Sequence, residues 1–244
     1  MCEVAAEAGY AEVGFAEHVD FDPTDQGYGY FDYQAYSAAV EELREQFVGR
    51  LTVLKGIEVD FQARFVEDIS RFLGACEFDF VMGSVHYLDG PFIHEDTLPD
   101  RPLEETYRIY ARETRALIAT GLFDILGHLD YVRSRAVGVF QDEELDRFTP
   151  LLADLATKAA QGDLVLEVNV KADRPPVPTV DVLRAYLKAG GTGVVVGTDS
   201  HRLWQFDGGW DRAVAYLTQV GAPDVALFRG RRRRLSPLVR PSAL

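Results

Sequence analysis

The chain has 244 residues, of which 47% are hydrophobic, and a formal net charge of −14, so it can bury a full core as one domain over residues 1–244. The acidity argues against a nucleic-acid partner, because binding to a phosphate backbone depends on clustered Lys and Arg side chains. No apolar run reaches the roughly 18 residues of a membrane span, no signal-peptide profile is present, and two cysteines are too few for a disulfide framework, which together predict a cytoplasmic protein without a membrane partner.

Short apolar runs alternate with helical patterns along the whole chain. The expected strands cover residues 13–16, 52–57, 78–83, 123–127, 164–168 and 193–197. The expected helices cover residues 2–9, 33–47, 65–73, 104–120, 143–161 and 179–189. Six strands with helical crossovers predict a parallel α/β sheet, either an open doubly wound sheet or a closed barrel. No GxGxxG or Walker A pattern follows a strand, which disfavours the nucleotide-binding open sheets.

Side chains that bind metals gather where these strands end. Four of the five histidines lie there, together with three carboxylates: His18, Glu58, His86, His128, Asp130, Asp199 and His201. The carboxyl ends of barrel strands converge on one face, so these side chains are expected to point into one place. Imidazole with carboxylate is the usual ligand set of Zn, Mn and Fe, and such clusters activate water for phosphate-ester hydrolysis. We therefore expect a site for two or more divalent metal ions.

Several nearby polar residues have simpler expected roles. Asp130 is expected to orient His128 or to cap the following helix. His94, in the loop PFIHEDTLPD, is expected at the surface, although that loop could cover the site. Three aspartates after the first strand are expected to act as turn and cap residues: Asp20, Asp22 and Asp25.

The strings GFAEHVDF, GIEVDF, FDFVMGSVHYLDG, FDILGHLDYV and GTDSH resemble the polymerase-and-histidinol-phosphatase (PHP) superfamily, in particular its histidinol-phosphate phosphatases of histidine biosynthesis. The resemblance covers residues 1 to about 202 and implies a distorted (β/α)7 TIM-like barrel with a trinuclear metal site. It implies that Glu58 bridges two metals. The other implied metal ligands are His18, His86, His128, Asp199 and His201.

The resemblance is incomplete at the N-terminus. The family begins with a strand that ends in an H-x-H motif, which is absent here, and residues 2–9 are similar to the helix that follows that strand. We therefore expect a barrel that lacks its first strand, a chain that begins about 20 residues late as judged from the size of a strand–loop–helix unit, and a misplaced start at Met1. The metal site formed by H-x-H with Glu58 and Asp199 would lose half of its protein ligands, and the one formed by His18 and His201 would lose its third. The site formed by Glu58, His86 and His128 would keep its ligands.

Phosphate binding calls for positive side chains, preferably arginine with its bidentate fork. Arg133 is the first candidate, with a catalytic role in neutralising the phosphoryl oxygens, and Lys171 and Arg174 are further substrate-binding candidates. Asp199 or a histidine would protonate the leaving oxygen. The tail RGRRRRL, residues 229–235, is expected to be a solvated edge strand rather than a binding patch.

Three functions remain open on the sequence. The first is hydrolysis of histidinol phosphate, and the second is hydrolysis of another small phosphomonoester, since pocket residues decide the substrate. The third is an inactive metal-binding remnant, because the H-x-H motif is missing.

Overall fold

The computed structural model describes residues 1–206, 209–221 and 223–238. Its strands form one eight-stranded sheet in which every strand lies beside its neighbours in sequence. The strands are β1 (Glu12–Val19), β2 (Thr52–Asp60), β3 (Phe80–Ser84), β4 (Ile125–Leu126), β5 (Val165–Asn169), β6 (Val194–Gly197), β7 (Val225–Arg229) and β8 (Arg232–Ser236). All six expected strands are present, and the β7–β8 hairpin follows them.

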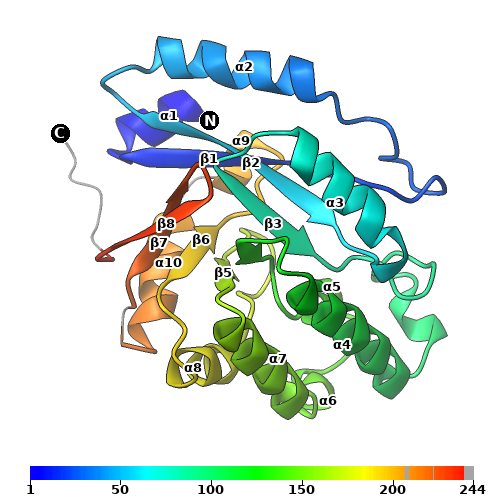
Figure 1. The fold of residues 1–244 in the computed structure, drawn as a ribbon. Helices are drawn as coiled ribbons and strands as arrows, with labels where there is room; N and C mark the ends of the chain where they lie inside the picture. The colour runs from blue at the N-terminus through cyan, green and yellow to red at the C-terminus, as the bar shows by residue number, and fades with distance from the viewer. Residues whose placement is uncertain (207–208, 222, 239–244) are drawn as a thin grey trace.

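Helices cross over between the parallel strands (Figure 1). The α-helices are α1 (Cys2–Glu7), α2 (Tyr33–Gln46), α3 (Val66–Ala75), α4 (Leu103–Thr120), α5 (Tyr131–Arg135), α6 (Asp142–Asp146), α7 (Thr149–Gln161), α8 (Val180–Lys188), α9 (Leu203–Phe206) and α10 (Gly209–Thr218), with short 3-10 helices η1 (Ala63–Phe65) and η2 (Leu98–Asp100). The expected helix at 143–161 is two helices, because Pro150 occupies the first turn of α7 and cannot sit inside a continuous helix.

The order of the strands decides between the two expected architectures. Strands β1 to β7 are parallel and run in sequence order without a reversal, as in a barrel and unlike a doubly wound sheet. The sheet curls so that the β7–β8 hairpin returns toward β1 (Figure 1), where Arg234 pairs with Glu12. The fold is therefore of the TIM-like α/β barrel type, with an antiparallel β8 paired to β7 at the end of the sheet.

Alternation along the strands separates an inner face from an outer face. The inner face is apolar toward the start of the strands, where Leu54, Phe80, Met82, Ile125, Val165, Ala226 and Phe228 form one cluster. Two inner-face positions are glycines because the ring of Phe80 fills the space: a Cβ on Gly56 would lie 2.1 Å from that ring, and one on Gly14 2.7 Å. Apolar side chains thus fill the interior of the barrel below the level at which the predicted ligands lie.

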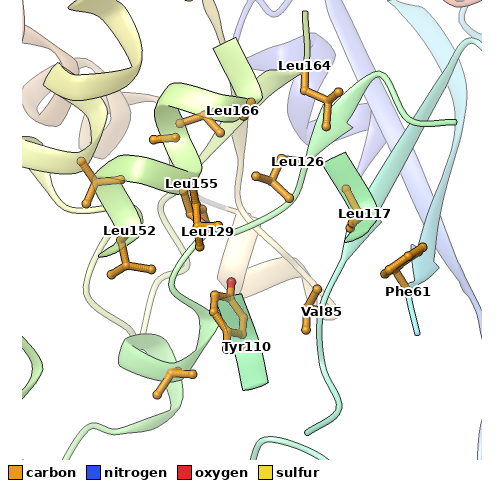
Figure 2. Packing of buried hydrophobic residues seen from close by; sticks show 14 of the residues in the cluster. Phe61, Val85, Tyr110, Leu117, Leu126, Leu129, Leu152, Leu155, Leu164 and Leu166 are labelled. Carbon is orange, nitrogen blue, oxygen red and sulfur yellow. The ribbon is translucent and has the colours of Figure 1, made fainter. Parts of the chain in front are cut away.

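The outer face of the sheet packs against the helices in a larger core. Figure 2 shows Leu152 and Leu155 of α7 and Leu126 of β4 among its labelled members, and all three are at most 1% exposed. Burial of a leucine stabilises the fold by about 2 kcal/mol. This layer fixes the strands whose ends carry the site.

The arginine-rich tail forms the β7–β8 hairpin at the start of the barrel strands. We expected its arginines to extend into solvent, but several of them pair with carboxylates. The pairs are Arg231 with Asp124 at 2.9 Å, Arg233 with Asp163 at 2.5 Å, and Arg234 with Glu12. The hairpin is thus tied electrostatically to the barrel. Among the residues described, no helix is both long enough and apolar enough to cross a membrane.

Candidate active site

The inner face turns polar where the strands end. His18 of β1 and Glu58 of β2 are register partners, so both side chains project from the same level of the barrel. His86 follows β3, His128 follows the two-residue strand β4, and Asp199 follows β6. The structure therefore brings these predicted ligands to one end of the barrel.

Glu58 lies at the centre of this group and is 7% exposed. Its Oε1 is 2.9 Å from Nε2 of His128 and 3.6 Å from Nε2 of His86, and its Oε2 is 3.5 Å from Nε2 of His18. Burial opposes ionisation of Glu58. The three nearby histidines nevertheless hold its pKa well below the usual range, with the largest effect from His18, followed by His128 and His86. One ionised carboxylate thus faces three imidazoles.

His86 and His128 point the same nitrogen toward Glu58. Their Nε2 atoms are 3.1 Å apart, and both residues are 4% exposed. Nδ1 of His86 lies 3.3 Å from Oδ1 of Asp60, which leaves its Nε2 turned toward the centre. A carboxylate behind a metal-binding imidazole fixes the orientation and tautomer of the ring. Asp60, which the sequence analysis did not single out, is therefore in place to orient His86.

The arrangement fits a divalent metal ion. Ligand atoms of His18, Glu58 and His86 lie within 4.8 Å of one another, and the paired Nε2 atoms of His86 and His128 face one carboxylate oxygen. Without a metal, the carboxylates favour protonated imidazoles. Glu58 is the main cause that raises the pKa of His18. Burial lowers the pKa of His128, but its hydrogen bond to Glu58 and the negative charges of Glu58, Glu167 and Asp199 together raise it to about 9. A donor set of imidazole and carboxylate suits Zn, Mn or Fe.

Asp199 and His201 lie at the open side of this group. The ring centroid of His201 is 6.1 Å from that of His18, and its side chain is 59% exposed. Asp199 has a left-handed backbone, with φ of 45°, and its Oδ2 accepts a hydrogen bond from Nζ of Lys171 at 2.6 Å. Lys171 is thus at the site, as a partner of a predicted ligand.

Glu167 on β5 is a buried carboxylate that the sequence analysis missed. Its Oε2 accepts the backbone N–H of His128 at 2.6 Å, and its Oε1 accepts from Nδ2 of Asn169 at 3.1 Å. Burial raises the pKa of Glu167 to about 7. Gly197 makes room for it, since a Cβ there would be 1.7 Å from Oε1. A charged residue inside the apolar strand LVLEVN was the signal that could have revealed it.

Arg133, the first candidate for phosphate, faces away from this group. Its guanidinium contacts Asp130 at 3.1 Å, Asp142 at 3.4 Å and Asp146 at 2.7 Å, and its side chain is 7% exposed. Three carboxylates therefore occupy its donors. The expectation of a phosphate-facing Arg133 overlooked the acidic α6, which lies against it.

Two other arginines lie beside the site, Arg135 of α5 and Arg174 after β5. Both contact Glu95, at 2.8 Å from Arg135 and 3.2 Å from Arg174. The guanidinium of Arg135 lies 5.9 Å from the ring centre of Tyr131. That ring is 4.7 Å from the rings of both His86 and His128. Arg135 is thus one aromatic ring away from the ligand group, and Arg174 is linked to it through Glu95.

The simpler roles expected for nearby residues are largely confirmed. Asp130 caps α5, since its side chain accepts the N–H of Arg133. Asp22 and Asp25 accept backbone N–H groups two residues ahead, as turn residues do. Among the described residues Asp20 accepts no such bond; instead burial, followed by the nearby Asp60 and Asp25, raises its pKa to about 6. His94 is 39% exposed on its loop.

A parallel barrel that ends in imidazoles around a buried carboxylate defines the class of this protein: a barrel enzyme that binds divalent metal ions at the carboxyl ends of its strands. The family described as "PHP domain" matches residues 1–171. The chain belongs to this PHP family.

Curated relatives support that assignment. A Deinococcus radiodurans protein named "Probable histidinol-phosphatase" is 32% identical over 83% of this chain and 76% of its own length. A histidinol-phosphatase of Lactococcus lactis is 26% identical over 91% of this chain and 84% of its own length.

A solved structure shares the fold. The crystal structure of histidinol phosphate phosphatase from Lactococcus lactis, complexed with Zn, L-histidinol and phosphate, superposes with a TM-score of 0.77 at 24% identity, covering 94% of this chain and 89% of that one. At this level of identity the likeness concerns the fold.

Proposed function

We propose that this protein is a histidinol-phosphatase, which hydrolyses L-histidinol phosphate to L-histidinol and phosphate. The observation that carries the proposal is the convergence of His18, His86 and His128 on Glu58. It occurs in a chain whose PHP-family relatives bear the histidinol-phosphatase name. A barrel alone would not define a substrate, since function lies in the site rather than in the fold.

The chain offers ligands for two or three divalent ions. Glu58, His86 and His128 would hold one, and Glu58 would bridge it to a second ion near Asp199. His18 and His201 would contribute to a further position. When bound, such ions lower the pKa of water and neutralise charge on the phosphoryl oxygens.

The protein groups around these ligands hold them in place. Asp60 turns Nε2 of His86 to the centre, and Glu167 anchors the backbone of His128. Lys171 pairs with Asp199 and fixes its carboxylate. Asp199 or a neighbouring histidine would protonate the leaving oxygen of the substrate.

The phosphoryl group also needs charged hydrogen-bond donors. Lys171 and Arg174 remain candidates, and Arg135 replaces Arg133, whose donors are taken by carboxylates. Arg135 and Arg174 are both partly open, each with a side-chain exposure of 17%. They come from different segments, Arg135 from α5 and Arg174 from the loop after β5, so a phosphate between them would be clamped from two sides.

The first test is release of inorganic phosphate from L-histidinol phosphate by the purified protein with added Zn²⁺ or Mn²⁺. A sugar phosphate and a nucleoside monophosphate serve as competing substrates, and a chelator serves as the control. Chelator-sensitive turnover with preference for histidinol phosphate is expected. Preference for another monoester would reassign the substrate, and no turnover of any of them by folded, metal-loaded protein would contradict the proposal.

A further inference from the structure

The two arginines beside the site share one internal partner. Oε1 of Glu95 is 3.2 Å from Arg174, and its Oε2 is 2.8 Å from Arg135. Burial opposes ionisation of Glu95, but its own backbone N–H, followed by Arg174 and Arg135, lowers its pKa. Three segments at the mouth of the barrel, α5 and the loops after β3 and β5, thus meet through one carboxylate.

Glu95 lies on the loop between β3 and α4, which is anchored on both sides of it. Ile93 is 1% exposed and its N–H donates to the carbonyl of His86 at 2.7 Å, and Leu98 is 2% exposed. His94 and Asp96, the two neighbours of Glu95, have side chains that are 39% and 88% exposed. The loop therefore has fixed ends and a solvent-facing middle, where Glu95 can leave the arginines without disturbing the core.

The arginines are incompletely satisfied by this carboxylate. Two guanidinium charges face one carboxylate charge, whereas a phosphate monoester carries nearly two negative charges at neutral pH. Nε of Arg135 is buried and has no hydrogen-bond partner among the described residues, and the contact of Oε2 with Arg135 lacks hydrogen-bond geometry. A phosphoryl group has a third terminal oxygen for such a donor, and its charge matches the pair better.

We infer that Glu95 is an internal occupant of the oxyanion site formed by Arg135 and Arg174, and that the phosphoryl group of the substrate enters this site by displacing it. Binding of the anion then releases the loop that carries Glu95. The inference rests on the proposed phosphatase function for the nature of the anion. A competing internal anion lowers the apparent affinity of the site for phosphate.

The test is calorimetric titration of inorganic phosphate into the Zn²⁺-loaded protein, which requires no turnover. Glu95→Gln keeps the shape of the side chain but removes its charge, so phosphate is expected to bind about 5- to 10-fold more tightly, as for the loss of one competing ion pair. Asp96→Asn is the matched control: it removes the same charge one residue away, where the carboxylate contacts His94 and neither arginine. Its affinity should stay within about twofold of the wild type.

Unchanged or weaker phosphate binding by Glu95→Gln would overturn the inference, and so would an equal gain in Asp96→Asn, which would reduce the effect to net charge. Arg174→Met provides a further arm, with phosphate affinity expected to fall at least about 10-fold. A fall in that variant without a gain in Glu95→Gln would keep the arginine site and overturn the competition. A gain in Glu95→Gln in a protein that does not hydrolyse histidinol phosphate would contradict the proposed function and support the internal occupant.

Discussion

Buried carboxylates have different kinds of partners at the two ends of the barrel. At the start of the strands, Asp79 accepts hydrogen bonds from the backbone of Lys55 at 2.9 Å and of Gly230 at 3.1 Å, and pairs with Arg44 at 2.5 Å. At the other end, Glu58 contacts imidazoles. There, Nδ1 of His128 is buried without a hydrogen-bond partner among the described residues, and Oδ1 of Asp60 has only its 3.3 Å contact with Nδ1 of His86, which lacks hydrogen-bond geometry.

The difference separates structural charge from functional charge. Buried polar groups are normally satisfied, because an unsatisfied one costs about 1–3 kcal/mol. Asp79 follows that rule with hydrogen bonds and a cation, and Asp124 does so with the N–H of Val81 and with Arg231. The cluster around Glu58 departs from this rule, because some of its buried polar atoms lack hydrogen bonds, as expected of a site that binds cations. The kind of partner, rather than the presence of a charge, therefore carries the information.

The largest expected effect comes from neutralising the carboxylate that the imidazoles share. Glu58→Gln should lower bound metal and phosphatase activity by at least about 100-fold, since the central ligand is lost. Metal analysis, phosphate release and circular dichroism measure content, activity and fold. Glu17→Gln is the control, because Glu17 alternates with the inner-face residues of β1 and projects outward. Full activity and metal content in Glu58→Gln would refute its central role.

A substitution at the start of the strands should change the stability of the fold and leave catalysis unchanged. Asp79→Ala removes the acceptor of two backbone N–H groups and the partner of Arg44, so the free energy of unfolding should fall by about 3 kcal/mol. Urea denaturation measures this free energy, and kcat is expected to stay within about twofold of the wild-type value. Glu41→Ala is the control, because it breaks an exposed pair of the same Arg44 and should cost less than about 0.5 kcal/mol. A large fall in kcat for Asp79→Ala would undo the separation between the ends.

A smaller effect concerns the metal-free protein and pH. The pKa of His128 is raised from 6.5 to about 9, so the protonated form stabilises the fold. This contribution is fully present below pH 6.5, the unfolded value, and is lost as pH rises through about 9. The free energy of unfolding of chelated protein should therefore fall by up to about 3 kcal/mol over this range, since one pKa unit corresponds to about 1.4 kcal/mol.

Urea denaturation at several pH values measures the slope. His128→Gln should flatten it, whereas His201→Gln should not, because the side chain of His201 is 59% exposed. An equal slope in the wild type and in His128→Gln would remove His128 as the source of the dependence.

The sequence by itself predicted a parallel α/β sheet and the gathering of histidines and carboxylates at its carboxyl ends. Apolar runs marked the strands, and the side chains that follow them converge because all parallel strands end at the same edge of the sheet. The meeting of His18, His86 and His128 around Glu58 was predicted in this way. The β7 strand and the break before α7 were missed because short elements depend on local turn chemistry and on Pro150.

Only the tertiary structure decided which charges serve the site. Arg133 and Arg135 are two positions apart on α5, which turns them about 200° from each other, so one meets α6 and the other meets Glu95. Likewise, Asp60 and Glu167 became part of the site through the neighbours that their strands gave them. Strand periodicity is local and can be read from the chain, whereas the partner of a charge depends on segments far away in the sequence.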